Sequence, residues 1–196
     1  MKREATIKRK SSETDIQLQF TIDGNGTSKI SSGNHFMDHL LKLFASHGFF
    51  NFNLSCKGDI EIDFHHSIED IGICLGKAVD EALLDKKGIR RYSTTYVPMD
   101  ESLSRVSLDI CGRSNLLYSV ILIDRKINNF ECDLVEDFFK AFTDHSRITM
   151  HIDLLRGRNS HHSIESIFKA FGRSLSEACG INPRAGNNIP STKGII

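Results

Sequence analysis

The sequence lacks a long hydrophobic run and an excess of charge of either sign. Its longest apolar stretch, NLLYSVILI at 115–123, is interrupted by Tyr118 and Ser119, and a membrane-spanning helix needs roughly 20 apolar residues. The start, MKREATIKRK, has no apolar segment and does not match a secretory signal. Because 25 basic residues balance 25 acidic ones, no charge footprint for nucleic acid or an anionic membrane is visible. We expect a cytoplasmic protein that binds neither.

Paired cysteines are also absent. The cysteines are odd in number and widely spaced, and no two form a CxxC pair: they are Cys56, Cys74, Cys111, Cys132 and Cys179. This pattern argues against a disulfide framework and against a zinc site built on thiolates. We expect reduced thiols that are mostly buried.

Hydrophobic periodicity predicts alternating strands and helices in a chain long enough for one core or for two halves that share one. DGNG at 23–26 is typical of a hairpin turn, and Gly48 of a helix C-cap. The expected elements are a strand at 15–23, a helix at 34–48, a strand at 49–56, a helix at 65–85, strands at 103–110 and 115–123, a helix at 132–146, a strand at 147–155 and a helix at 163–180.

The order of elements is the same in both halves, and parts of the sequence are repeated. HHSIEDIGICLGKAVDEA aligns with HHSIESIFKAFGRSLSEA, and upstream MDHLLKLFASH aligns with VEDFFKAFTDH. One supersecondary unit is therefore used twice. We predict an α+β fold and a single domain of two pseudo-repeats, at about 1–92 and 93–196, packed around a common sheet layer.

The repeated motif HHSIE indicates a metal site. On a helix, Glu69 can share a target with His65 or with His66, whereas adjacent histidines point about 100° apart. Neighbouring histidines therefore indicate two ions or two faces. Imidazole with carboxylate and without thiolate suits Mn, Fe, Co, Ni or Zn, and a mixed nitrogen and oxygen shell favours octahedral geometry. His39 and its counterpart in the alignment, Asp137, are further ligand candidates.

A single HHxxE would be more typical of a solvated helix start, where an acidic residue suits the helix dipole. The second copy at 161–165 and the further histidines nearby favour a metal site instead. His151, inside an expected strand, fits a core residue and a support for the ligands equally well. His35 has no counterpart in the repeat, and we interpret it as an ordinary helix-start or surface residue.

Basic and hydroxyl side chains lie in or beside the turns and element ends of the motif regions. One such residue alone would be typical of the solvated surface, but their grouping around a metal site indicates a small phosphorylated substrate. In the tail PSTKG, hydroxyl, amide and ammonium groups together suit a phosphate. The candidates are Arg91, Arg113, Lys169, Ser191, Thr192 and Lys193.

Five ordered segments, FMDHLLKLFASHG, DFHHSIEDIGICLGKA, VPMDESLSRVSLDICGR, LRGRNSHHSIESIFKAFGRSL and PSTKGII, resemble the imidazoleglycerol-phosphate dehydratases. The resemblance covers nearly the whole chain. It implies an α+β fold of two duplicated half-domains with sheets packed on helices, like the second domain of ribosomal protein S5. It further implies the single-function form without a preceding phosphatase domain, two manganese ions per site, and a homo-oligomer of twenty-four subunits built from trimers, with active sites between neighbouring chains.

Carried over by position, the resemblance implies roles for individual residues. Metal ligands fall on His39, His65, His66, Glu69, His161, His162 and Glu165, and Asp137 stands where many members have a histidine. Phosphate and substrate contacts fall on Arg91, Arg113, Lys169, Ser191, Thr192 and Lys193. Glu13, His39 and His47 complete the substrate side, with Glu13 and His47 as catalytic residues.

The implied activity is that of a hydro-lyase that converts imidazole glycerol phosphate to imidazole acetol-phosphate in histidine biosynthesis. Our hypothesis is an imidazolate held by two manganese ions, with Glu13 moving the carbon-bound proton. A dinuclear metal phosphoesterase would use the same ligand types. A non-catalytic metal-binding shell would explain the histidines but not Arg91, Arg113, Lys169 and Lys193.

Overall fold

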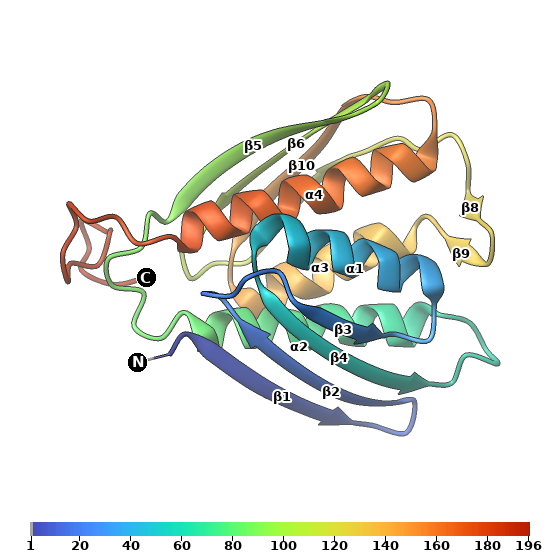
Figure 1. The fold of residues 1–196 in the computed structure, drawn as a ribbon, viewed down its shortest axis with the longest axis horizontal. Helices are drawn as coiled ribbons and strands as arrows, with labels where there is room; N and C mark the ends of the chain where they lie inside the picture. The colour runs from blue at the N-terminus through green and yellow to red at the C-terminus, as the bar shows by residue number, and fades with distance from the viewer. Residues whose placement is uncertain (1) are drawn as a thin grey trace.

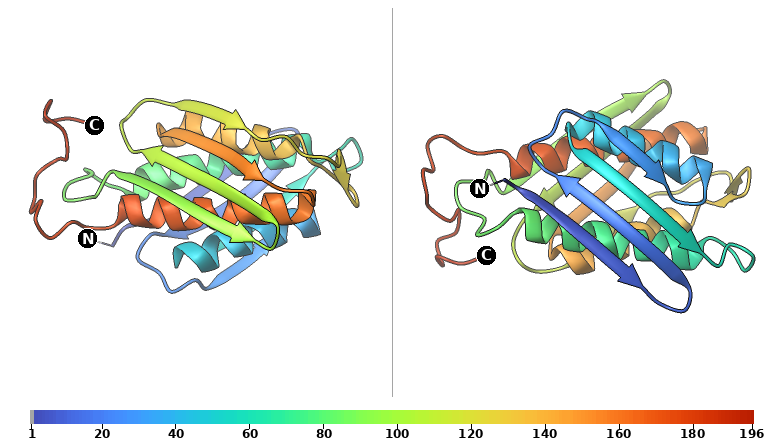
Figure 2. Two further views of the ribbon diagram at one scale, coloured as in Figure 1. Left: turned by 90° about the horizontal axis from the view of Figure 1, so that it is seen from above. Right: turned by 60° about the horizontal axis from the view of Figure 1, so that its bottom comes forward.

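The computed structural model describes residues 2–196. Four helices form a central layer between two four-stranded sheets, one from each half of the chain (Figures 1 and 2). The predicted fold class, α+β with duplicated halves and sheets packed on helices, is confirmed. The expected common sheet layer is wrong, because each sheet buries one face on helices and the halves meet through those helices.

The first half shows how the sequence produces these layers. Along the second strand, Ile16, Leu18 and Phe20 are buried while the residues between them are exposed, so one face packs on helices. The sheet order is β1-β2-β4-β3, and only the β3–β4 pairing is parallel. The elements are β1 (Glu4–Lys10), β2 (Thr14–Thr21), β3 (Ser28–Ser31), α1 (His35–Gly48), β4 (Asn51–Gly58) and α2 (His65–Ala82).

The second half repeats this topology. Its sheet order is β5-β6-β10-β7, and again only the last pairing, β7 with β10, is parallel. A short ribbon of β8 and β9 precedes the third helix. The elements are β5 (Tyr92–Met99), β6 (Ser102–Asp109), β7 (Asn115–Ser119), β8 (Lys126–Ile127), β9 (Phe130–Glu131), α3 (Leu134–Ser146), β10 (Thr149–Arg156) and α4 (Ser160–Cys179).

Three local predictions are wrong. DGNG makes no hairpin, because β1 and β4 occupy the two edges of β2 and the chain passes on to β3 beside β4. The strand expected at 115–123 ends at Ser119, and Ile121 beyond it is 88% exposed. The left-handed residue after α1 is Phe49, with φ 57°, whereas Gly48 belongs to the helix.

The helices pair across the two halves, α1 with α4 and α2 with α3. Glycine permits the close approach at matching places in the repeat. A Cβ on Gly172 would lie 2.4 Å from the carbonyl oxygen of Phe44, and a Cβ on Gly76 would lie 2.6 Å from that of Phe142. Because each helix packs on a helix of the other half, residues far apart in the sequence come into contact.

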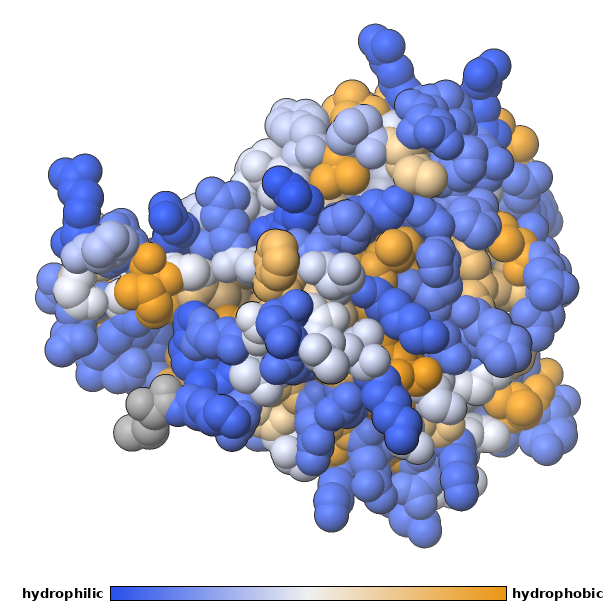
Figure 3. All heavy atoms as spheres, viewed as in Figure 1, coloured by the Kyte–Doolittle hydropathy of each residue, from blue (hydrophilic) through white to orange (hydrophobic). Residues whose placement is uncertain are grey.

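All four helices begin at one end of the molecule, and the turns between β1 and β2 and between β5 and β6 lie at that same end (Figure 1). The N-terminal strand start and the C-terminal tail lie at the opposite end (Figure 2). Hydrophilic side chains cover most of the face in view, with scattered apolar areas (Figure 3). Within residues 2–196, no helix has the length and apolar character needed to cross a membrane.

Candidate metal centre

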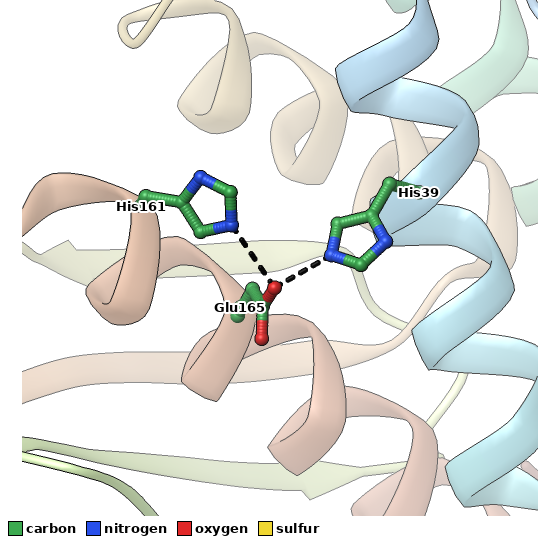
Figure 4. Close-up of side chains that lie close together, drawn as sticks. All are labelled: His39, His161 and Glu165. Carbon is green, nitrogen blue, oxygen red and sulfur yellow. Dashed lines mark hydrogen bonds and ion pairs between the residues drawn. The ribbon is translucent and has the colours of Figure 1, made fainter.

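Two histidines and a glutamate converge where α1 meets α4, and we call His39, His161 and Glu165 the α1–α4 cluster. The Nε2 atoms of His39 and His161 lie 2.6 Å and 3.0 Å from the same Oε1 of Glu165 (Figure 4). One ligand atom from each residue lies within 4.8 Å of the others. The Glu165 side chain is only 9% exposed, so an ion there would be partly shielded from water.

Asparagine caps hold the two helix starts that carry this cluster. The Asn34 side chain accepts hydrogen bonds from the amides of Phe36 and Met37, and the Asn159 side chain accepts them from the amides of His161 and His162. Such caps satisfy backbone donors that a helix leaves unpaired at its start. The asparagine caps therefore hold in place the first helical turns, which carry the candidate ligands.

Glu165 is ionised over the whole physiological range. Burial alone would raise the pKa of its carboxyl, but hydrogen bonds from His39, Lys169 and His161 outweigh burial and lower the pKa to about 2. Lys169 Nζ donates to the second oxygen at 2.7 Å. An anionic carboxylate beside two imidazoles is a donor set that a divalent cation of the manganese to zinc series accepts.

A matching group lies where α2 meets α3, and we call His65, Glu69 and Asp137 the α2–α3 cluster. His65 Nδ1 lies 3.5 Å from Asp137 Oδ2, and His65 Nε2 lies 3.9 Å from Glu69 Oε2. The group is more open than the α1–α4 cluster, because Glu69 and Asp137 are 49% and 43% exposed. Both carboxylates therefore remain solvated.

The second histidine of each pair points the other way, toward a strand turn. His66 Nδ1 lies 3.0 Å from Asp59 and its Nε2 lies 3.8 Å from Glu13. Adjacent side chains on a helix project about 100° apart, and the ring centroids of His65 and His66 lie 6.2 Å from each other. His66 is therefore oriented away from the ion group that His65 joins.

His162 has the same arrangement in the second half. Its Nδ1 lies 2.9 Å from Glu101 and 3.8 Å from Asp100, and its ring plane is 85° from that of His161. These three residues form a second group with ligand atoms within 4.8 Å of one another. Hydrogen bonds to Asp59 and Glu101 raise the pKa of His66 and His162, and the His162 contact lowers that of Glu101 to about 2.

Sequence reasoning named Glu13 but missed Asp59, Asp100 and Glu101. Glu101 follows β5 as Glu13 follows β1, and each is followed by a hydroxyl residue that begins the next strand, Thr14 or Ser102. Aligning the two hairpins would have shown the match between Glu13 and Glu101. No comparable sequence signal marks Asp59, whose role depends on where the loop after β4 meets the start of α2.

All the candidate phosphate residues except Lys169 lie toward the opposite end of the molecule. Arg91 pairs with Asp109 at 2.7 Å, and its Nη1 donates to the carbonyl of Pro190 at 2.8 Å, so it holds the tail with Ser191, Thr192 and Lys193. Ile196 packs on Gly112, next to Arg113. The amide of Arg91 also donates to the carbonyl of Ala178, roughly 25 Å from His161 along α4 at about 1.5 Å per residue.

Lys169 and His47 lie nearer the histidines. Lys169 contacts Glu165 and the sulfur of Met99, not the arginines. His47, in the last turn of α1, has a pKa lowered by burial and by the positive charges of Lys169 and Arg173. A neutral imidazole beside these cations suits the substrate side of a site.

Two other histidines are unrelated to either cluster. His35 is exposed at the first position of α1, as predicted. His151 is exposed on the outer face of β10, whereas Met150 and Ile152 are buried. The interpretation of His151 as a core residue is wrong, because strand alternation turns it away from the helices, and its role as a support for the ligands stays a prediction.

Comparisons with known proteins show the family of this chain. The family model described as imidazoleglycerol-phosphate dehydratase matches residues 32–175. Proteins of that name from Thermoanaerobacter and Caldanaerobacter subterraneus are 53% and 52% identical over 194 residues, which cover 99% of this chain and 100% of theirs.

Solved structures of such enzymes are also similar. The enzyme from Staphylococcus aureus matches with a TM-score of 0.83 and 40% identity, over 91% of this chain and 99% of that one. The enzyme from Pyrococcus furiosus matches with a TM-score of 0.83 and 30% identity, over 97% and 100%. This chain therefore belongs to the imidazoleglycerol-phosphate dehydratase family.

Proposed function

We propose that this chain dehydrates imidazole glycerol phosphate to imidazole acetol-phosphate in histidine biosynthesis. The observation that carries the proposal is the convergence of His39, His161 and Glu165, from two helices of different halves, on one point. The names of the similar proteins support the reaction class. Loss of the hydroxyl next to the ring and of a proton from the following carbon gives an enol, which becomes the ketone.

The proposed cofactor is a pair of manganese ions. The α1–α4 cluster and the α2–α3 cluster would each hold one, and both groups offer the nitrogen and oxygen donors that such ions accept. When bound, the ions would supply positive charge that stabilises negative charge on the imidazole ring of the substrate.

Glu13 is the proposed proton carrier. It lies in the turn between β1 and β2, half exposed, with Oε1 3.8 Å from His66 Nε2. A carboxylate in a surface turn can reach a substrate held beside the histidines and accept its carbon-bound proton. His47, whose pKa is lowered, would remain neutral and orient the substrate.

Neighbouring copies of the chain are needed to complete the site. Within one chain, Arg91 bonds to Ala178 in the last turn of α4 and holds the tail through Pro190, whereas His161 lies in the first turn of α4. This separation is longer than a small substrate. A homo-oligomer that places one copy's tail beside another copy's histidines removes this separation. We propose the assembly of twenty-four subunits built from trimers and a cytoplasmic location.

A direct assay tests the proposed function. Metal-stripped full-length protein is incubated with imidazole glycerol phosphate, Mn²⁺ is added back, and ketone and inorganic phosphate are both measured. We expect manganese-dependent ketone without phosphate. Phosphate release would indicate a dinuclear phosphoesterase, and metal uptake without any product would indicate a metal-binding shell.

A further inference from the structure

The α1–α4 and α2–α3 clusters are equivalent positions of the internal repeat. In sequence, HHSIE supplies His65 and Glu69 to one group and His161 and Glu165 to the other. In the fold, each of these helices packs against the helix of the other half that carries the third member, His39 or Asp137. Any difference between the groups is therefore a difference between matched positions.

Their donor sets differ at that third member. The α1–α4 cluster offers two imidazoles and one carboxylate, whereas the α2–α3 cluster offers one imidazole and two carboxylates. Imidazole favours borderline ions such as Zn²⁺ and Co²⁺, and carboxylate favours harder ions such as Mn²⁺ and Mg²⁺. The replacement of imidazole by carboxylate thus shifts metal preference at one of two matched positions.

Neighbouring charge increases the difference. Lys169 Nζ lies 2.7 Å from Glu165 and offsets its charge, while Ile73 occupies the corresponding position on α2. With neutral histidines, the α1–α4 cluster and Lys169 sum to zero charge, whereas the α2–α3 cluster carries two negative charges. The α2–α3 cluster therefore attracts cations mainly through charge.

Preorganisation differs as well. The helices of the α1–α4 cluster both begin with an asparagine cap, Asn34 and Asn159, but the cap positions of α2 and α3 make no side-chain hydrogen bond. The ligand atoms of the α1–α4 cluster already converge, and His65 is 3.5 Å and 3.9 Å from its two carboxylates. Binding an ion at the α2–α3 cluster requires its side chains to move closer together, whereas the side chains of the α1–α4 cluster are already in place.

We infer that the two ion sites of this enzyme are unequal: the α1–α4 cluster binds first and prefers borderline ions, and the α2–α3 cluster binds later and prefers hard ions because of Asp137. This inference rests on the proposed function, since both groups are taken as metal sites. It identifies Asp137 as the residue that sets the metal preference of the second site.

The test is a metal titration of the metal-stripped full-length protein with Co²⁺ and, separately, with Mn²⁺. Bound metal is counted after equilibrium dialysis, with cobalt absorption and manganese spin resonance as site-sensitive signals. For Co²⁺ we expect two steps of one ion per chain whose dissociation constants differ by at least about 10-fold, the lower range for changes around a metal. For Mn²⁺ we expect the two steps to lie closer together.

The decisive variant is Asp137→His, which gives the second group the donor set of the first. It should tighten the second Co²⁺ step at least about 10-fold and weaken Mn²⁺ there. His39→Asp should weaken the first Co²⁺ step by a similar factor, and Asp137→Asn, which keeps the shape without the charge, should weaken Mn²⁺. Asp144→Asn, on the same helix as Asp137, is the control and should leave both titrations unchanged.

The outcomes separate this inference from the proposed function. Equal Co²⁺ steps in the parent, or an Asp137→His variant that titrates like the parent, would overturn the inference even if ketone forms normally. Two unequal steps that respond to Asp137→His would support it even if no ketone forms, in which case the dehydratase proposal alone would fail.

Discussion

His39 and Glu165 are 126 positions apart in the sequence, yet His39 Nε2 lies 2.6 Å from Glu165 Oε1. The contact exists because α1 of the first half packs on α4 of the second. It links the two copies of the repeat, and it makes Glu165 the shared partner of both histidines in the α1–α4 cluster.

Glu165→Gln should lower divalent-metal affinity and dehydratase activity together. The glutamine keeps the shape but removes the negative charge that a cation requires, so we expect at least about a 10-fold loss of affinity. Metal content after dialysis and ketone formation measure the two effects. Glu81→Gln, exposed on α2, is the matched control. A Glu165→Gln protein that retained parental manganese affinity would show that Glu165 is not a ligand.

Glu13→Gln should separate metal binding from turnover. The residue lies in a strand turn, 3.8 Å from His66, so its loss should leave the metal content close to that of the parent. Removal of a proton-transfer group typically lowers kcat by about 10²- to 10⁴-fold. Steady-state kinetics with a metal assay on the same sample make the comparison, with Glu4→Gln on β1 as control. Normal turnover with both ions bound would contradict the role of Glu13.

Metal binding should weaken as the pH falls, and earlier than for free imidazole. Contacts with Asp59 and Glu101 raise the pKa of His66 and His162 above the usual value of about 6.5. His66 and His162 lie outside both clusters within one chain, and we propose that a neighbouring copy contributes them as ligands. A raised pKa keeps the imidazole protonated to higher pH, and a protonated imidazole cannot bind a metal. Activity should therefore be lost as the pH falls through these raised pKa values.

Carboxylate variants test the cause of this pH dependence. Asp59→Asn and Glu101→Gln remove the negative charge beside each histidine, so they should move the acid limb of the manganese-binding curve to lower pH. Asp85→Asn, a solvated carboxylate beyond α2, should leave the curve in place. Acid limbs that coincide in all four proteins would show that these contacts do not control metal binding.

Lys193→Ala should weaken substrate binding without changing metal content. The tail is held at Arg91 by the bond to the carbonyl of Pro190, which leaves the Lys193 side chain exposed to meet an anion. Loss of one ammonium contact to a phosphate should raise KM about 10- to 150-fold, because hydrogen bonds to charged groups contribute about 1.5–3 kcal/mol. Lys126→Ala is the control. An unchanged KM would place the phosphate elsewhere.

Gly172→Ala and Gly76→Ala should destabilise the fold. The added methyl groups would lie 2.4 Å and 2.6 Å from backbone carbonyl oxygens of the facing helices, and overpacking of this kind costs about 1–3 kcal/mol. Thermal unfolding of the metal-free protein measures the effect, with the exposed Lys77→Ala as control. Because the added methyl group would push the paired helices apart, both variants should also bind metal more weakly. Parental stability in both variants would show that the helices move apart freely.

The edge strands show why sequence reasoning missed part of the fold. β1 and β5 were not predicted, because an edge strand packs few side chains: along β1 only Ile7 is buried, and basic residues occupy much of the rest. Charged edge strands avoid pairing with other chains, and the same feature hides their alternation. The four helices were predicted because each buries an apolar stripe of period 3.6.

The sequence by itself determined the helices, the duplication and the histidine and carboxylate residues of the repeat, because hydrophobic period and the repeated HHSIE motif are local properties of the chain. Only the tertiary structure decided which partners meet. Packing of helices across the two halves joined His39 to Glu165 and Asp137 to His65, and it directed His66 and His162 toward carboxylates in strand turns. Tertiary packing also placed Arg91 and the tail at the far end, because the helix that separates them from the histidines is about 30 Å long.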